Sequence, residues 1–160
     1  MVFVGEEIEG EVMSEHIKVI TIWQPWASLI AHGHKKFETR SWKTSWSGEI
    51  LIHAAKKWDI GQQQFYEAYC RKLLGKDEPL PKGRIVAKAN LVECVPTESI
   101  VGELSSQELL FGDYSGNRYA WKLDNVEPLG FPIRWKGLQG MWQIDYEKFM
   151  AQVNFGEMEW

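Results

Sequence analysis

The sequence predicts one α+β domain built around a small β-barrel. Two observations favour this class: short strand-like segments are separated by glycine turns, and they do not alternate regularly with helices as a doubly wound sheet requires. The chain has 160 residues, of which 44% are apolar, so we expect one hydrophobic core of ordinary size. No repeat and no linker-like segment divides the sequence.

The first half of the chain begins with a strand, a helix and two further strands. The β-branched run 16–23 is typical of a mostly buried strand. Residues 24–33 predict a helix of about two turns that ends at Gly33, which can take the left-handed conformation of a C-cap. Segments 35–42 and 48–58 predict the next two strands.

The second half begins with a helix over residues 59–75. Asp59 is its expected N-cap, because Gln62 stands three residues on, the spacing of a capping box. The other expected elements are a strand over 84–95, a helical turn near 105–110, a strand over 118–129, two short strands over 131–137 and 140–145, and a helix over 146–153.

The formal charge of −4 is unevenly distributed. Residues 1–16 carry −5 and residues 89–160 carry −6, whereas residues 33–88 carry twelve Lys or Arg against six Asp or Glu, which gives +6. The acidic total therefore hides a basic middle. A basic face attracts phosphate groups even on a protein of negative net charge, because the local field guides the encounter.

Several other classes of protein are disfavoured by missing patterns. Cys70 and Cys94 form no CxxC pair, and residues 1–16 lack the pattern of a secretory leader, so we expect reduced thiols and a cytoplasmic location. No apolar run is long enough for a membrane span. His32 and His34 lack further ligands nearby, and no P-loop or GxSxG motif is present, so we expect no metal and no cofactor.

The stretch 33–40, GHKKFETR, concentrates charge beside an expected helix end. Lys35 lies in the turn, and Glu38 and Arg40 lie about 7 Å apart on one strand face. Two interpretations are open at this point. The two strand residues can form an ordinary ion pair, or the cluster can bind an anionic group.

This stretch fits the pattern G-x-K-x-x-E-x-R and resembles the ASCH (ASC-1 homology) domain family. The flanking blocks ITIWQPWASLI, SGEILIHAAKKW, PKGRIVAKANLVECV and YAWKLDNVEPL also resemble that family, in the same order. The resemblance covers residues 17–144. Residues 1–16 are then an acidic N-terminal tail, and residues 145–160 a C-terminal helix and tail.

The resemblance implies a PUA-like fold, a small mixed β-barrel flanked by two to four helices. It also implies a nucleic-acid-binding module for RNA or single strands, with a nucleotide in a cleft beside the barrel, bordered by the motif and the first helix. The oligomeric state is left open.

The expected nucleic-acid-binding residues combine the motif with its aromatic neighbours. Lys35 and Arg40 would hold anionic groups, and Glu38 would fix Arg40 or accept from an exocyclic amine. Indole rings stack on bases, although core packing explains tryptophans equally well. A glutamine at the strand-to-helix step can read a base edge. The neighbours concerned are Trp23, Gln24, Trp26 and Trp42.

Two alternatives belong to other classes. Some relatives resemble amidohydrolases of N4-acylated cytidines, and ribonuclease activity has been proposed in the family; catalysis would then rest on Lys35 as nucleophile or base, with Glu38 as a second base. The amidohydrolase-type members carry Thr three residues after the lysine, where this chain has Glu38, which weighs against that chemistry. The other alternative is a protein-interaction domain that binds no nucleotide.

Overall fold

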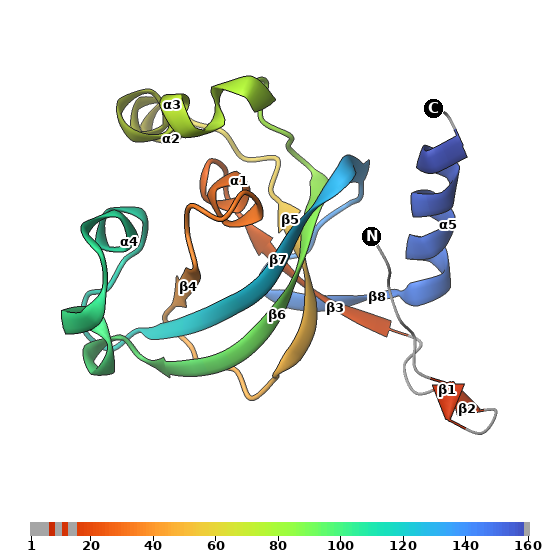
Figure 1. Cartoon of the computed structure of the whole chain (residues 1–160), viewed down its shortest axis with the longest axis horizontal. Helices are drawn as coiled ribbons and strands as arrows, with labels where there is room; N and C mark the ends of the chain where they lie inside the picture. Colours follow the sequence, from red (N-terminus) through yellow and green to blue (C-terminus); the bar gives the residue numbers. More distant parts are fainter. Residues whose placement is uncertain (1–6, 9–10, 13–15, 159–160) are drawn as a thin grey trace.

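A curved six-stranded sheet forms the centre of the computed structural model, which describes residues 7–8, 11–12 and 16–158 (Figure 1). The strand order is β4-β7-β6-β5-β3-β8, and two short strands outside it, β1 and β2, pair with each other. The strands are β1 (Glu7–Ile8), β2 (Glu11–Val12), β3 (His16–Ile22), β4 (Phe37–Arg40), β5 (Gly48–Ala54), β6 (Arg84–Pro96), β7 (Tyr119–Arg134) and β8 (Met141–Asp145). The rest of the predicted acidic tail, at 1–6, 9–10 and 13–15, lies outside the described residues.

The sheet is mixed, since β3 and β5 pair in parallel and the other neighbours in it pair antiparallel. The α+β prediction is confirmed, but the sheet is open: in the described part of the chain no ladder joins β4 to β8. Strands β6 and β7 curve strongly, and their pairing shifts register at three places. Such bulges bend a sheet, but the edge strands have only four and five residues and do not close it.

Helices cover both faces of the sheet (Figure 1). α1 (Trp26–Ala31) and a continuous helix of α2 (Ile60–Phe65), a π-turn (Tyr66–Cys70) and α3 (Arg71–Leu74) lie on one side; α4 (Ser106–Phe111) precedes β7, and α5 (Tyr146–Met158) follows β8. The predicted capping box is confirmed, because Asp59 Oδ1 accepts from Gln62 N at 2.9 Å and Gln62 Oε1 accepts from Asp59 N at 3.0 Å. No described helix has both the length and the apolar character needed to cross a membrane.

Strand β3 is buried on both faces, which explains its nearly continuous apolar sequence. Ile20 packs in the core beneath α1, whereas its neighbour Val19 packs with Phe149 of α5 on the other face. The strand is therefore held rigidly, and the turn that follows it projects from a fixed base.

Residues 118–137 differ from prediction, because two expected strands form the single strand β7. A proline inside a strand removes a ladder hydrogen bond and is tolerated where the strand edge has no partner. β4 pairs with β7 only over 119–122. Pro128 and Pro132 therefore lie beyond the part of β7 that has hydrogen-bonded strands on both sides, and they do not end the strand.

Candidate functional site

The turn after α1 directs Lys35 into the molecule. Gly33 takes the left-handed conformation, with φ at +81°, as the sequence predicts for a helix C-cap. The next two amides, of His34 and Lys35, both donate to the carbonyl of Leu29, at 2.8 and 3.1 Å. The chain thus folds back against the end of the helix, and the Lys35 side chain points inward.

Lys35 is buried, including the Nζ atom at the end of its side chain. The residue is 1% exposed, and no described residue accepts a hydrogen bond from its Nζ. Burial lowers the pKa of Lys35, and the nearby carboxylates of Glu38 and Glu108 oppose that effect. A buried polar group without a partner is costly, so this arrangement requires an explanation.

Glu38 and Arg40 form the ion pair that the sequence left open. Arg40 donates to Glu38 Oε2 from Nη2 at 2.9 Å and from Nε at 3.2 Å, and Nη2 also donates to the carbonyl of Thr21 at 2.7 Å. Glu38 Oε1 accepts from the amide of Thr39 at 3.0 Å. The pair therefore fixes β4 to the end of β3 and places a carboxylate beside Lys35.

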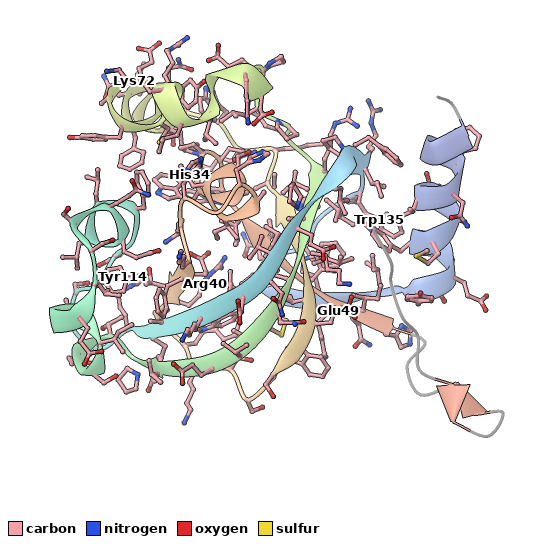
Figure 2. All side chains as sticks on the ribbon, viewed as in Figure 1. His34, Arg40, Glu49, Lys72, Tyr114 and Trp135 are labelled. Carbon is pink, nitrogen blue, oxygen red and sulfur yellow. The ribbon has the colours of Figure 1, made fainter. Side chains whose placement is uncertain are left out.

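The wall facing the motif comes from α4 and the connection after it. Glu108 accepts from the amide of Lys36, and Tyr114 Oη donates to Glu108 at 3.4 Å. Burial, followed by the Glu108 carboxylate, raises the pKa of Tyr114. Figure 2 shows Tyr114 and Arg40 on the same side of the curved sheet.

Arg118 adds a third cation at the start of β7. Its Nη2 donates to the carbonyl of Thr39 at 3.1 Å, and its Nε pairs with Asp113 at 3.4 Å. Sequence analysis missed Glu108, Tyr114 and Arg118, because they lie far from the motif along the chain. The antiparallel pairing of β4 with β7 brings them to it, and no local pattern in the sequence marks them.

A cavity of about 660 Å³ opens between these two walls. It combines cations, carboxylates and aromatic rings, and Lys35 lies among its lining residues. The lining consists of Thr21, Ile22, Trp23, Trp26, Lys35, Glu38, Thr39, Arg40, Phe65, Leu110, Phe111, Gly112, Asp113 and Arg118. This is the usual size of a small-molecule site, with apolar walls and a few converging polar groups.

Five of the seven residues expected at the site line the cavity, and two do not. Trp23, which is 48% exposed, and Trp26 join the three charged motif residues there. Gln24 is fully buried, and its amide donates to Ser28 Oγ at 2.7 Å and to the carbonyl of Pro81 at 2.8 Å, so it has no free edge for a base. Trp42 instead packs edge-on against Trp121, with 4.7 Å between the ring centroids.

A comparison with protein families decides what kind of domain this is. The model of the ASCH domain matches residues 20–133. The chain belongs to the ASCH domain family. The cavity lies within this ASCH domain, and Lys35, Glu38 and Arg40 of the G-x-K-x-x-E-x-R motif are among its lining residues.

Comparisons with individual proteins agree. Over 135 residues the chain is 30% identical to human activating signal cointegrator 1, and equally to the mouse protein. It spans only 22% of the length of those relatives. The crystal structure of an ASCH protein from Zymomonas mobilis superposes with a TM-score of 0.54 at 18% identity, covering 86% of this chain and 93% of that one. A point mutant of that protein gives a TM-score of 0.54 at 17% identity, covering 86% and 96%. These likenesses show that the chain shares its fold with that ASCH protein.

Proposed function

We propose that this ASCH domain binds nucleic acid, as RNA or another single strand, with one nucleotide in the cavity. The observation that carries the proposal is the Lys35 ammonium, which is buried, lies at a cavity of about 660 Å³ and has no hydrogen-bond acceptor among the described residues. A ligand that brings an oxygen or nitrogen acceptor would complete it.

The other lining residues fit the remaining parts of a nucleotide. Trp23 and Trp26 offer aromatic faces, which stack on any base. Arg118 also lines the cavity, and its guanidinium is suited to a phosphate. Arg40 is already bonded to Glu38 and Thr21, so its role is to position the Glu38 carboxylate and add positive charge.

The charge balance of the cavity predicts the salt dependence. Lys35, Arg40 and Arg118 oppose the carboxylates of Glu38 and Asp113, which leaves one net positive charge in the lining. Each phosphate contact adds about −0.7 to the logarithmic salt slope for a single strand. One nucleotide in the cavity should therefore give a shallow slope.

The test uses matched substitutions at two adjacent lysines. Lys35→Met removes the buried ammonium and keeps most of the aliphatic stem, while Lys36→Met makes the same change at an exposed neighbour. Removing one partner of a buried charged hydrogen bond costs about 2 kcal/mol or more, so Lys35→Met should weaken binding of a fluorescein-labelled RNA hexamer pool at least about 30-fold. Fluorescence anisotropy measures the effect, and Lys36→Met should change binding less than about threefold.

Two results would overturn the proposal. One is a wild-type protein that binds neither the RNA pool nor its DNA counterpart at low salt. The other is a folded Lys35→Met variant, verified by circular dichroism, that binds like the wild type.

The lowered pKa of Lys35 favours a second candidate, hydrolysis of a modified nucleoside or of RNA. A lysine that burial makes less basic is deprotonated at lower pH and can act as nucleophile or base. Glu38 and Glu108 are close enough to interact with it electrostatically and could exchange protons with it. Chromatography of N4-acetylcytidine and of RNA after incubation tests this candidate: product formed by the wild type and not by Lys35→Met would support it, and intact substrate at high protein concentration would exclude it.

A further inference from the structure

Two tryptophan–lysine pairs extend from the wall of the cavity. Lys57 Nζ lies 3.6 Å from the ring centroid of Trp23, which lines the cavity. The next residue is Trp58, and Lys82 Nζ lies 4.6 Å from its ring centroid. One lysine side chain and one peptide unit therefore connect the two indoles.

Trp58 lines a separate cavity of about 390 Å³, together with Gln63, Tyr66, Glu78, Pro79, Leu80 and Lys82. Its ring is held in place, because Nε1 donates to Gln63 Oε1 at 3.0 Å and the ring meets Tyr66 edge-on at 6.3 Å. The ring of Tyr66 is buried; burial, followed by Glu78, raises the pKa of its hydroxyl to about 12. We call this second cavity the Trp58 pocket.

We propose that the Trp58 pocket holds a second nucleotide of a single strand whose first nucleotide occupies the Lys35 cavity. This inference rests on the proposed function and adds the direction in which the strand leaves the cavity: past Trp23 and Lys57 towards Trp58 and Lys82. The domain would then bind at least two consecutive nucleotides.

The chemistry of the pocket fits a base and its phosphate. A fixed indole is a stacking platform whose geometry need not be ordered on binding. Lys57 and Lys82 each lie over an indole ring. An ammonium exchanges that weak contact for a phosphate oxygen when a base takes its place on the ring. The Tyr66 hydroxyl is buried and has no hydrogen-bond partner among the described residues, so it offers a donor for the edge of a base; the Glu78 carboxylate, which Arg71 holds at 3.3 Å, offers an acceptor.

The chain also contains a matched control for this surface. Trp46 is 38% exposed, and Lys18 Nζ lies 5.5 Å from its ring centroid. It is a tryptophan with a lysine over its ring, as Trp58 is, but it lines neither cavity. Loss of an exposed aromatic residue in general can therefore be separated from loss of this pocket.

The experiment measures binding against strand length by fluorescence anisotropy and, for mononucleotides, by competition. Probes are the four nucleoside monophosphates and random pools of RNA and DNA of two, three and six nucleotides. We expect the wild type to bind two nucleotides markedly more tightly than one. Trp58→Ala should weaken binding of the longer strands roughly 5- to 150-fold and leave monophosphates unchanged. Lys82→Ala, which leaves the ring in place, should reduce the salt slope by about 0.7. Trp46→Ala should change nothing.

The outcomes separate this inference from the proposed function. If monophosphates and strands all fail to bind, the proposed function itself is wrong. If monophosphates bind and longer strands bind no more tightly, or if Trp58→Ala and Lys82→Ala both match Trp46→Ala, the second nucleotide site is overturned. A Trp58→Ala variant that fails to fold leaves Lys82→Ala to decide. Whichever of the RNA and DNA pools binds more tightly identifies the sugar.

Discussion

Lys35 and His53 are both buried and titratable, but among the described residues only His53 has hydrogen-bond partners for its side chain. The ring of His53 is 2% exposed, its Nε2 donates to the carbonyl of Trp135 at 2.8 Å, and its Nδ1 lies 3.4 Å from Thr21 Oγ1. Lys35 is equally buried, but its Nζ has no acceptor among the residues that the structure describes, and it lines a cavity. A polar group that the protein satisfies belongs to the fold, whereas one that it leaves unsatisfied is available for a ligand.

Two glycines test this difference, and the larger effect is expected beside His53. A Cβ added at Gly137 would overlap His53 Cε1, and the ring is held by its hydrogen bond to the Trp135 carbonyl. Gly137→Ala must therefore displace backbone, and we expect a loss of about 1–3 kcal/mol in the free energy of unfolding. Urea denaturation measures it. A variant as stable as the wild type would show that the loop can move away from His53.

The matching change beside Lys35 should affect binding more than stability. A Cβ at Gly112 would meet the Tyr114 ring at 2.6 Å and Lys35 Nζ at 3.3 Å, and both Gly112 and Lys35 line the cavity. Gly112→Ala should weaken RNA binding about tenfold, because it fills space that the ligand needs, and cost less than about 1 kcal/mol of stability. If the two glycine variants showed the same pattern, the contrast between the regions would be wrong.

How much of this could be predicted depends on whether the cause is local. Gly33 as a helix C-cap, the Asp59 capping box and the strand β3 follow from neighbouring residues, and the structure has all three. The motif places Lys35 in a turn, but its burial depends on α4, some seventy residues later. The same limit hid Glu108 and Tyr114, whose approach is set by sheet pairing and not by any pattern in their own segment.

Local residues also misled the sequence analysis at two positions. Gln24 follows a strand and precedes a helix, where a polar side chain usually meets solvent. In the structure it is buried, and its amide donates a hydrogen bond to the carbonyl of Pro81. Trp42 shares its expected strand face with Arg40, but β4 ends at Arg40, so the alternation does not continue to it. Tertiary packing in one case and a short strand in the other decide where these side chains lie.

The free energy of unfolding also tests whether Lys35 lacks a partner in the folded protein. Because the Lys35 ammonium is buried and the described part of the chain offers it no acceptor, Lys35→Met should raise the free energy of unfolding by about 1 kcal/mol, or the melting temperature by about 2–4 °C. Thermal denaturation with Lys36→Met as the control measures this. The folded-state pKa of Lys35 lies below its ordinary value of 10.5, so the wild type gains stability as pH rises towards 10.5, and the advantage of the variant should shrink there. A destabilised variant would mean that Glu38 and Glu108 satisfy the lysine after all.

The smallest expected effect is the contribution of His53 to the pH dependence of the free energy of unfolding. Burial lowers the pKa of His53 below 6.5, although its bond to the Trp135 carbonyl opposes the shift. The folded state therefore binds fewer protons than the unfolded state just below pH 6.5, so stability is lost as pH falls through that value towards the folded-state pKa.

His53→Gln tests this assignment, since its amide can still donate to the carbonyl of Trp135 but does not titrate. We expect the variant to lose less stability than the wild type between about pH 7 and 5, by up to about 1 kcal/mol, as one pKa unit corresponds to about 1.4 kcal/mol. Burial also lowers the pKa of His34, so His34→Gln is measured alongside and should change the pH profile in the same direction. Parallel pH profiles for the wild type and His53→Gln would show that His53 titrates as it does in the unfolded chain. Burial of His53 would then have no effect on its titration. The contrast between a buried polar group with hydrogen-bond partners and one without them would rest on Lys35 alone.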